Sequence, residues 1–342
     1  MSNLAIGISH NGAIKLGDQV TCDGFVYGYK YRVQTHLHDD HMNNFDSSKH
    51  FQTIIMSEPT RSLLEIRHAE MPYSTNVITH PLNGIREYDG IKIELKSSSH
   101  MLGAVQVSVT TPSGERLGYS GDFSWPLEDV IEVDQLVIDS TYGNPESVRK
   151  YTQEEANDSF KEIVAKKIQE GPIIIKGHRG TLYRALELLD GLVQCPIIAS
   201  KKKIDEAKVC EDYGYCICEL TELENPNIRK LRKEGPYIEL RYIGEHILYE
   251  PGDCTNINLS ASWVQGSVPL LKVSDSTYSI GVTDHADFSG TLEYIKATGA
   301  KVIITDSVRG KKYASLLANA ITKKLNIEAY PAKIVRSKAW GV

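Results

Sequence analysis

One short segment of the chain combines three histidines with two aspartates in the order His36-Leu37-His38-Asp39-Asp40-His41. Imidazole and carboxylate groups are the ligands that zinc and neighbouring transition metals accept in open hydrolytic sites. Residues 31–35 alternate as a strand does, so His36 and His38 share one face and are spaced to hold one ion. Asp40 and His41 lie just past the strand end, where they are placed to turn toward a second ion. The segment therefore predicts a metal site.

The length and the hydropathy pattern limit the class of protein. At 342 residues the chain is long enough for about two domains, or for one domain with a large insertion. No apolar run approaches the roughly 18 residues of a membrane span, and residues 1–16 lack the basic start and apolar core of a signal peptide. We therefore expect an intracellular, cytoplasmic protein with no membrane partner.

The cysteines do not form a dense framework, and we interpret them as reduced thiols. Cys216 and Cys218 are separated by one residue, which suits one face of a strand better than a zinc knuckle. The six positions are Cys22, Cys195, Cys210, Cys216, Cys218 and Cys254.

The formal net charge of −6 is not typical of a nucleic-acid-binding domain, which often carries a basic excess. Three local cationic runs nevertheless permit a polyanionic substrate, although each alone is most often a solvated face. They are Lys201 to Lys203; Arg229, Lys230, Arg232 and Lys233; and Arg309, Lys311 and Lys312.

The chain changes character near Tyr151. Before it lie short strand patterns, at 91–95, 104–109 and 135–138. Thr152 and Glu155 then form a capping box that predicts a helix to about residue 169. Strand patterns at 173–176 and 196–199 alternate with helical patterns at 181–189 and 204–213, which predicts a small parallel sheet flanked by helices. A strand pattern followed by a helical pattern returns near the end of the chain, at 302–305 and 311–325.

Two later residues supply further metal-ligand types. His100 stands in Ser97-Ser98-Ser99-His100-Met101-Leu102-Gly103, between two strand patterns, and Asp122 stands in Tyr119-Ser120-Gly121-Asp122-Phe123. Alone, either residue is more typical of a structural turn. In this order after the first cluster, they complete most of a site for two metal ions.

This ordered set resembles the metallo-β-lactamase superfamily. The resemblance implies an αββα sandwich, in which two β-sheets are covered by helices and hold two divalent ions at one edge. The ions are expected to be zinc, with manganese or magnesium as alternatives. By position, His36, His38 and His100 would hold the first ion, Asp40 and His41 the second, and Asp122 would bridge them.

Two further segments narrow the reaction. Asp139-Ser140-Thr141-Tyr142-Gly143 directly follows a strand pattern, and Thr283-Asp284-His285-Ala286-Asp287-Phe288-Ser289-Gly290 follows the βαβ region. They resemble the first two signature motifs of the β-CASP group, the nucleic-acid hydrolases of the superfamily. The resemblance implies that Asp139 orients His285 near the leaving group. It also implies a metallo-β-lactamase domain over 1–151 and 276–342, with an inserted β-CASP domain over 152–275.

The third signature of the group is a histidine in RNA-processing members. It is a valine in DNA-acting members such as the crosslink-repair and Artemis-like nucleases. Within Ile304 to Gly310, Val308 best matches this position. The resemblance therefore implies DNA rather than RNA, and a second ion that lacks one histidine ligand.

Two segments are candidate phosphate contacts. Gly177-His178-Arg179-Gly180-Thr181 lies between a strand and a helix pattern, where backbone N–H groups and the helix dipole favour an anion, although a purely structural turn fits equally well. No Gly-Lys-Ser/Thr follows, so the segment is not a Walker motif and triphosphate use is rejected. Ser140 and Thr141 are the second candidate phosphate contact.

We therefore expect a metal-dependent DNA nuclease, an exonuclease in DNA repair or processing, located in the cytoplasm, or in the nucleoid or nucleus if it acts in DNA repair. Metal-activated water would attack the phosphodiester, with Asp40, Asp139 and His285 as catalytic residues and His285 as general acid. The main alternative is an RNA-processing ribonuclease. A small-molecule hydrolase would leave the inserted domain unexplained. An inactive nucleic-acid-binding subunit fits poorly with the complete first metal set.

Overall fold

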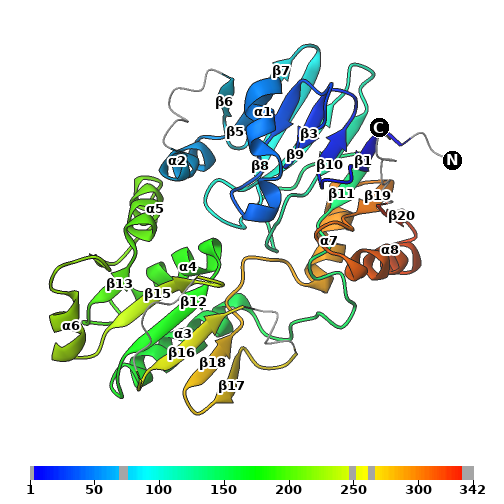
Figure 1. The fold of residues 1–342 in the computed structure, drawn as a ribbon. Helices are drawn as coiled ribbons and strands as arrows, with labels where there is room; N and C mark the ends of the chain where they lie inside the picture. Colours follow the sequence, from blue (N-terminus) through cyan, green and yellow to red (C-terminus); the bar gives the residue numbers. More distant parts are fainter. Residues whose placement is uncertain (1–3, 69–75, 246–251, 261–265, 333–342) are drawn as a thin grey trace, which may run out of the picture. The chain divides into compact units, whose positions relative to one another are not determined.

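The computed structural model describes residues 4–68, 76–245, 252–260 and 266–332 (Figure 1). The chain divides into two compact units. The first unit joins Met1–Ser147 to His285–Val342, and the second unit is Val148–Asp284. Both units contain sheets and helices, so the described chain is of the mixed α/β class.

The first unit contains a six-stranded sheet whose strands are in chain order. The first three strands pair antiparallel, and β3 to β6 pair parallel. The strands are β1 (Ile6–Ile8), β2 (Ile14–Leu16), β3 (Val20–Cys22), β4 (Tyr31–Val33), β5 (Thr53–Ser57) and β6 (Val77–His80).

A seven-stranded sheet completes the first unit. It mixes parallel pairs, from β10 through β11 and β19 to β20, with antiparallel pairs from β7 to β10. In spatial order the strands are β20 (Glu328–Pro331), β19 (Val302–Thr305), β11 (Gln135–Ile138), β10 (Arg116–Tyr119), β9 (Val105–Thr110), β8 (Ile91–Ser97) and β7 (Gly84–Tyr88).

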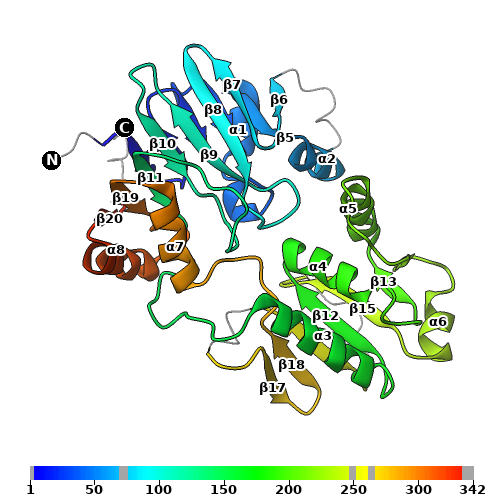
Figure 2. The ribbon, with the colours of Figure 1, turned by 180° about the vertical axis from the view of Figure 1, so that it is seen from behind.

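The two sheets of the first unit share one hydrophobic core. Val33 and Ile55 of the first sheet and Ile93 and Val107 of the second belong to the same cluster and are fully buried. Helices α1 (Phe45–Phe51) and α2 (Glu58–Arg67) pack against β5. Helix α8 (Lys312–Leu325) packs against β19 and β20, beside α7 (Phe288–Thr298) (Figures 1 and 2). Two packed sheets with helices are compatible with the expected sandwich.

The second unit is built on a seven-stranded sheet, larger than the small sheet that the sequence predicts. All neighbouring strands are parallel except β17 and β18. In spatial order the strands are β14 (Leu220–Glu222), β13 (Ile197–Ala199), β15 (Ile238–Tyr242), β12 (Ile173–Gly177), β16 (Thr255–Leu259), β18 (Thr277–Ile280) and β17 (Leu270–Ser274). The helices are α3 (Gln153–Lys167), α4 (Arg179–Leu189), α5 (Lys201–Asp212) and α6 (Ile228–Glu234).

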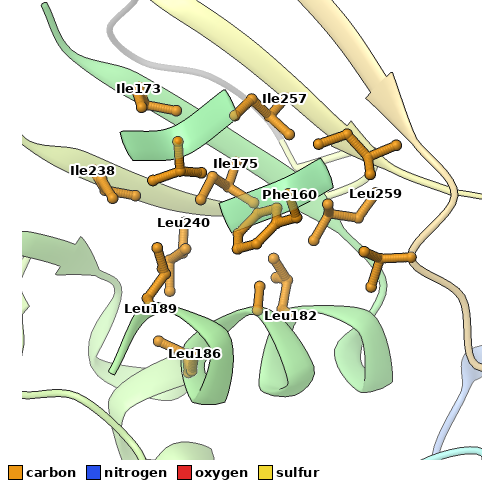
Figure 3. Packing of buried hydrophobic residues seen from close by; sticks show 14 of the residues in the cluster. Phe160, Ile173, Ile175, Leu182, Leu186, Leu189, Ile238, Leu240, Ile257 and Leu259 are labelled. Atoms are coloured by element: carbon orange, nitrogen blue, oxygen red, sulfur yellow. The ribbon is translucent and has the colours of Figure 1, made fainter. Parts of the chain in front are cut away.

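The core of the second unit lies between this sheet and helices α3 and α4 (Figure 3). Phe160 of α3 and Leu186 of α4 meet Ile175 of β12 in one buried cluster. Helix α3 begins with the capping box that the sequence predicts, because Thr152 accepts from Glu155 N and the Glu155 carboxylate accepts from Thr152 N.

Two details differ from the sequence expectations. Residues 277–280, expected within the metallo-β-lactamase domain, form β18 and pair with β16 in the sheet of the second unit. The hydropathy pattern of residues 277–280 cannot show which sheet they join, because their partner strand lies elsewhere in the sequence. Cys216 and Cys218 precede β14 and belong to no named strand. All six cysteines are free.

Candidate metal centre

Three histidine rings meet in the first unit. His36 and His38 follow β4, His38 in extended backbone, and His100 lies in the turn between β8 and β9. The Nδ1 atom of His38 lies 3.2 Å from Nε2 of His36 and 3.0 Å from Nε2 of His100. Burial is the largest influence on the pKa of His36 and holds it well below its usual range. The His36 ring is therefore neutral, which is the form that binds a metal ion.

Asp122 brings a carboxylate to the same three rings. It follows β10, and its Oδ2 atom lies 3.6 Å from Nε2 of His36 and 3.7 Å from Nε2 of His100. Burial alone would raise the pKa of Asp122, but the histidines around it, led by His41, hold this pKa well below its usual range. The group therefore offers a charged oxygen beside the neutral ring of His36.

The spacing of these donors fits a transition-metal ion. Zinc bound tetrahedrally at about 2.0–2.1 Å separates neighbouring ligand atoms by about 3.4 Å. The separations above, from 3.0 to 3.7 Å, bracket this value. The donors, which all lie within 4.8 Å of one another, come from His36, His38, His100 and Asp122. By donor type and spacing, these residues fit the first ion that the resemblance implies.

A second donor group shares the Asp122 carboxylate. The Nε2 atom of His41 lies 3.3 Å from Oδ1 of Asp122 and 3.7 Å from Oδ2 of Asp40. Within the described residues this buried nitrogen has no hydrogen-bond partner. The Asp40 side chain is 62% exposed, so it is open to solvent. Because the two oxygens of Asp122 face different histidines, Asp122 is placed between the two groups.

Asp23 supports the second group, and the sequence analysis did not identify it. It follows β3, and its Oδ2 atom lies 2.7 Å from Nδ1 of the buried His41. Its carboxylate also accepts from Thr35 N at 2.8 Å and from Thr35 Oγ1 at 2.6 Å. With Nδ1 of His41 bonded to Asp23, Nε2 is left to face Asp122. The only local signal is an Asp-Gly pair after a strand, which is common in ordinary turns.

Two fully buried side chains hold the backbone of the ligand segment. Arg32 donates to the carbonyl oxygens of His41 and Asn43, both at 3.0 Å. Gln34 donates to the carbonyl oxygens of His36 at 2.6 Å and His41 at 3.1 Å. Burial lowers the pKa of Arg32 to about 10. These bonds fix the turn that carries the donors, so the rings are arranged before an ion binds.

Asp139 and His285 lie beside the same donors. Asp139 directly follows β11, and its Oδ2 atom lies 3.5 Å from Nδ1 of His285. The other ring nitrogen of His285, Nε2, lies 3.8 Å from Oδ2 of Asp122. The rings of His285 and His100 are 4.6 Å apart between centroids. The structure thus brings the expected metal ligands, Asp139 and His285 together in the first unit.

The candidate phosphate contacts near Asp139 have partners within the chain. Ser140 is buried and donates to the carbonyl oxygen of Ile138 at 3.3 Å. Thr141 donates from its backbone N at 2.9 Å and from Oγ1 at 2.8 Å to Oδ1 of Asp139. Thr141 therefore helps to hold the Asp139 carboxylate.

Residues 177–181 belong to the second unit. His178 precedes α4 as its N-cap, and Thr181 donates to the His178 carbonyl oxygen at 3.0 Å. Arg179 is paired with the buried Glu206 at 3.2 Å. The side chains of Arg179 and Thr181 thus have partners within this unit. The expected contact of an anion with the backbone N–H groups of Gly177, His178 and Gly180 stays a prediction.

Val308 contributes no donor atom and packs against the hydrophobic core of the first unit. Each cationic run contains a residue held in an ion pair, while its other members, among them Lys202, Arg229 and Lys312, are exposed as on a solvated face. Lys203 pairs with Glu245, and Arg232 with Glu239, both at 2.7 Å. Arg309 pairs with Asp306 at 2.8 Å. None of the helices in the described ranges combines the length and apolarity that a membrane crossing requires.

No family model matches the chain. An uncharacterized protein in the lig 3′ region of Acidianus ambivalens is 32% identical over 126 residues, which cover 36% of this chain and 89% of that protein. An RNase J-like protein of Methanocaldococcus jannaschii is 23% identical over 273 residues, which cover 70% of this chain and 62% of that protein. The DNA cross-link repair 1A protein of Homo sapiens is 33% identical over 144 residues, which cover 38% of this chain and 13% of that protein.

A crystal structure of a protein of unknown function from Enterococcus faecalis V583 matches with a TM-score of 0.56 and 12% identity, over 82% of this chain and 76% of that one. At this identity the likeness shows the fold alone. The chain spans less than two thirds of the RNase J-like and DNA cross-link repair relatives. Their similarity supports the resemblance to the metallo-β-lactamase superfamily and its β-CASP group.

Proposed function

We propose that this chain is a metal-dependent nuclease that hydrolyses phosphodiester bonds in DNA. The observation that carries the proposal is the position of His285, whose Nε2 lies 3.8 Å from Asp122 and whose Nδ1 lies 3.5 Å from Asp139. A carboxylate-supported histidine beside a group of metal donors matches the needs of phosphodiester hydrolysis. This reaction requires an activated water, charge neutralisation on the phosphoryl group and protonation of the leaving oxygen.

The donor groups would hold two divalent ions, with zinc favoured by their imidazole content. Bound ions of this kind lower the pKa of a coordinated water toward about 7 and offset charge on the phosphoryl oxygens. His36, His38 and His100 would hold one ion, Asp40 and His41 the other, and Asp122 would contact both. Asp23 holds the His41 ring through Nδ1, so that Nε2 faces the site.

His285 is the proposed general acid. Histidine titrates near neutral pH, so its Nε2 can hold a proton and release it to the leaving oxygen. Asp139 stabilises the protonated ring through Nδ1 and keeps Nε2 on the side of Asp122. Thr141 donates twice to the other oxygen of Asp139, so Oδ2 remains directed at His285.

DNA is the preferred substrate because Val308 stands where RNA-processing members of the β-CASP group have a histidine. The similarity to the DNA cross-link repair 1A protein adds support. RNA is the second candidate, because the RNase J-like relative matches 70% of the chain. An exonuclease acting in repair or processing remains the preferred form of the activity.

The proposal is tested with end-labelled DNA and RNA strands of matched sequence, incubated with the wild type and the Asp40→Asn variant. We expect DNA cleavage by the wild type, weaker RNA cleavage, and at least about a hundredfold loss of rate in D40N, because a metal donor is removed. Product lengths resolved in time distinguish stepwise removal of terminal nucleotides from internal cleavage.

Asp46→Asn is the matched control, because the Asp46 side chain is 84% exposed and lies outside the donor groups. It should retain the wild-type rate. Faster cleavage of RNA than of DNA would overturn the substrate preference. Full activity of D40N would overturn the assignment of Asp40 to the metal centre.

A further inference from the structure

Four aromatic side chains gather at the surface of the first unit. Phe51 is the last residue of α1, and its ring centroid lies 5.8 Å from that of Phe25, 6.3 Å from that of Tyr27 and 6.4 Å from that of His50. Tyr27 is 82% exposed and Phe51 is 64% exposed. We call these four side chains the aromatic patch.

The exposure of Phe51 is unusual for this chain. All six phenylalanines lie within the described residues, and Phe51 alone among them is exposed. Phe25 and Phe51 belong to neither of the two hydrophobic cores described above. The ring of Phe51 meets those of Phe25 and Tyr27 at interplanar angles of 42° and 68°, so these rings do not cover one another face to face. The patch therefore presents aromatic surface to solvent.

Both segments that carry the patch begin at the second donor group. Asp23, which bonds His41, lies two residues before Phe25, so the Cα atoms of Asp23 and Phe25 are at most about 7 Å apart. Helix α1 follows the ligand turn directly and advances only about 9 Å before it ends at Phe51. The aromatic patch is therefore close to the proposed metal centre.

Asn11 links the two segments at the surface. Its Nδ2 atom donates to the carbonyl oxygen of Phe25 at 2.7 Å and to Oδ1 of Asn44 at 3.1 Å. The neighbouring Asn43 donates to the carbonyl oxygen of Asp40 at 3.1 Å. The Asp40 side chain is itself open to solvent. A short run of hydrogen-bonded amides thus joins the aromatic patch to the exposed edge of the donor groups.

The size of the patch favours nucleobases over a protein partner. An aromatic side chain offers about 150–250 Å² of surface, so Tyr27 and Phe51 together expose about 300 Å². A stable protein interface, including one with a second copy of this chain, needs about 800 Å² on each partner. Unpaired bases stack singly on exposed rings, with little dependence on sequence.

We infer that the aromatic patch stacks unpaired bases of the nucleic-acid strand that the metal centre cleaves. The inference rests on the proposed function and names the form of its substrate, a strand that is single-stranded beside the metal centre. A stacked strand advances about 3.4 Å per nucleotide, so the bases on Phe25 and Phe51 lie only a few nucleotides from the donors. Bases within a duplex are stacked on one another and leave no face for these rings.

The test measures binding to labelled strands whose phosphorothioate linkages resist cleavage. The full chain is titrated onto a single strand, and onto the same strand in a duplex, and fluorescence anisotropy is followed at several salt concentrations. Phe51→Ala and Tyr27→Ala should each weaken single-strand binding about 5–100-fold, because one stacked base is lost. Duplex binding should change less than about twofold, and the salt dependence should stay the same because no phosphate contact is removed.

Further substitutions separate stacking from other roles. F51W keeps an aromatic face and should bind within about threefold of the wild type, whereas F51L is apolar without a ring and should lose as much as F51A. Y330A is the matched control, because Tyr330 is also exposed but lies on β20, and it should bind as the wild type does. The unfolding temperature of each variant confirms that it is folded.

Four results would overturn the inference. They are unchanged single-strand binding in F51A and Y27A, full binding by F51L, no single-strand binding by the wild type, and a wild-type dimer that F51A dissociates in sedimentation. The last result would assign the patch to a second copy of the chain. A protein that cleaves nucleic acid but fails these tests keeps the proposed function and loses the stacking surface. A protein that cleaves nothing, yet binds single strands through Phe51, loses the nuclease and keeps the surface.

Discussion

Replacing Asp23 by asparagine tests whether the metal site depends on a residue that is not itself a proposed ligand. In the structure its carboxylate faces only donors, namely Thr35 N, Thr35 Oγ1, Gln34 Nε2 and His41 Nδ1. Asparagine must turn its amide NH₂ toward one side of this set. Either orientation removes an acceptor from a fully buried position.

The two orientations have different costs. If the NH₂ group faces Thr35 N, two donors oppose each other in a buried site. If it faces His41, the ring must accept at Nδ1 and carry its proton on Nε2, the nitrogen that faces Asp122. One lost hydrogen bond to a buried charge corresponds to about 1.5–3 kcal/mol. Loss of a residue that orients a metal-binding histidine typically weakens metal affinity about 10–100-fold.

We therefore expect D23N to bind the second metal ion about 10–100-fold more weakly, while the first ion changes less. The assay is a titration of metal-free protein with Zn²⁺ against a chelating dye, together with thermal unfolding of each variant. Asp46→Asn is the control for an exposed aspartate and should match the wild type. A folded D23N protein that binds both ions as the wild type does would refute this role of Asp23.

Three further outcomes are expected. Asp139→Asn and His285→Ala should each lower the cleavage rate about 10²–10⁴-fold with unchanged metal content, measured by elemental analysis and product formation, and a parallel loss of metal would contradict the general-acid role. Thr152→Ala should destabilise the second unit by about 1 kcal/mol through loss of the Glu155 capping box, seen by chemical denaturation, and an unchanged midpoint would contradict it. In metal-free protein, burial lowers the pKa of His41, but Asp122 and Asp23 outweigh it and raise this pKa from 6.5 to about 10. The proton on folded His41 therefore stabilises the fold fully below pH 6.5, and this stabilisation is lost as pH rises through about 10, which pH-dependent unfolding would show.

The sequence identifies the proposed metal ligands because they are chemically unusual and fall in a fixed order. His36, His38 and His100 carry donor types that packing does not require at those positions, and Asp122 follows a strand. Strand ends concentrate these residues at one site, since the residue after a strand emerges at the edge of its sheet. The pairing of Asp139 with His285 came from the family resemblance, and the structure places their side chains 3.5 Å apart.

The features that the sequence missed depend on contacts between distant residues. Asp23 is an ordinary turn residue by its neighbours, and only the pairing of β3 with β4 places it against Thr35 and His41. The membership of β18 in the second sheet depends on parallel pairing with β16, which leaves no local pattern. Arg309 was expected in a cationic run, yet its pairing with Asp306 buries it.

The most direct test of the central claim is the dependence of DNA cleavage on bound metal. Purified protein is stripped with a chelator, and cleavage of end-labelled single-stranded and double-stranded DNA is followed before and after Zn²⁺, Mn²⁺ or Mg²⁺ is restored. We expect no cleavage by the stripped protein and recovery of the rate with at least one of these ions. Cleavage that persists without metal, or no cleavage with any of them, would contradict a metal-dependent DNA nuclease.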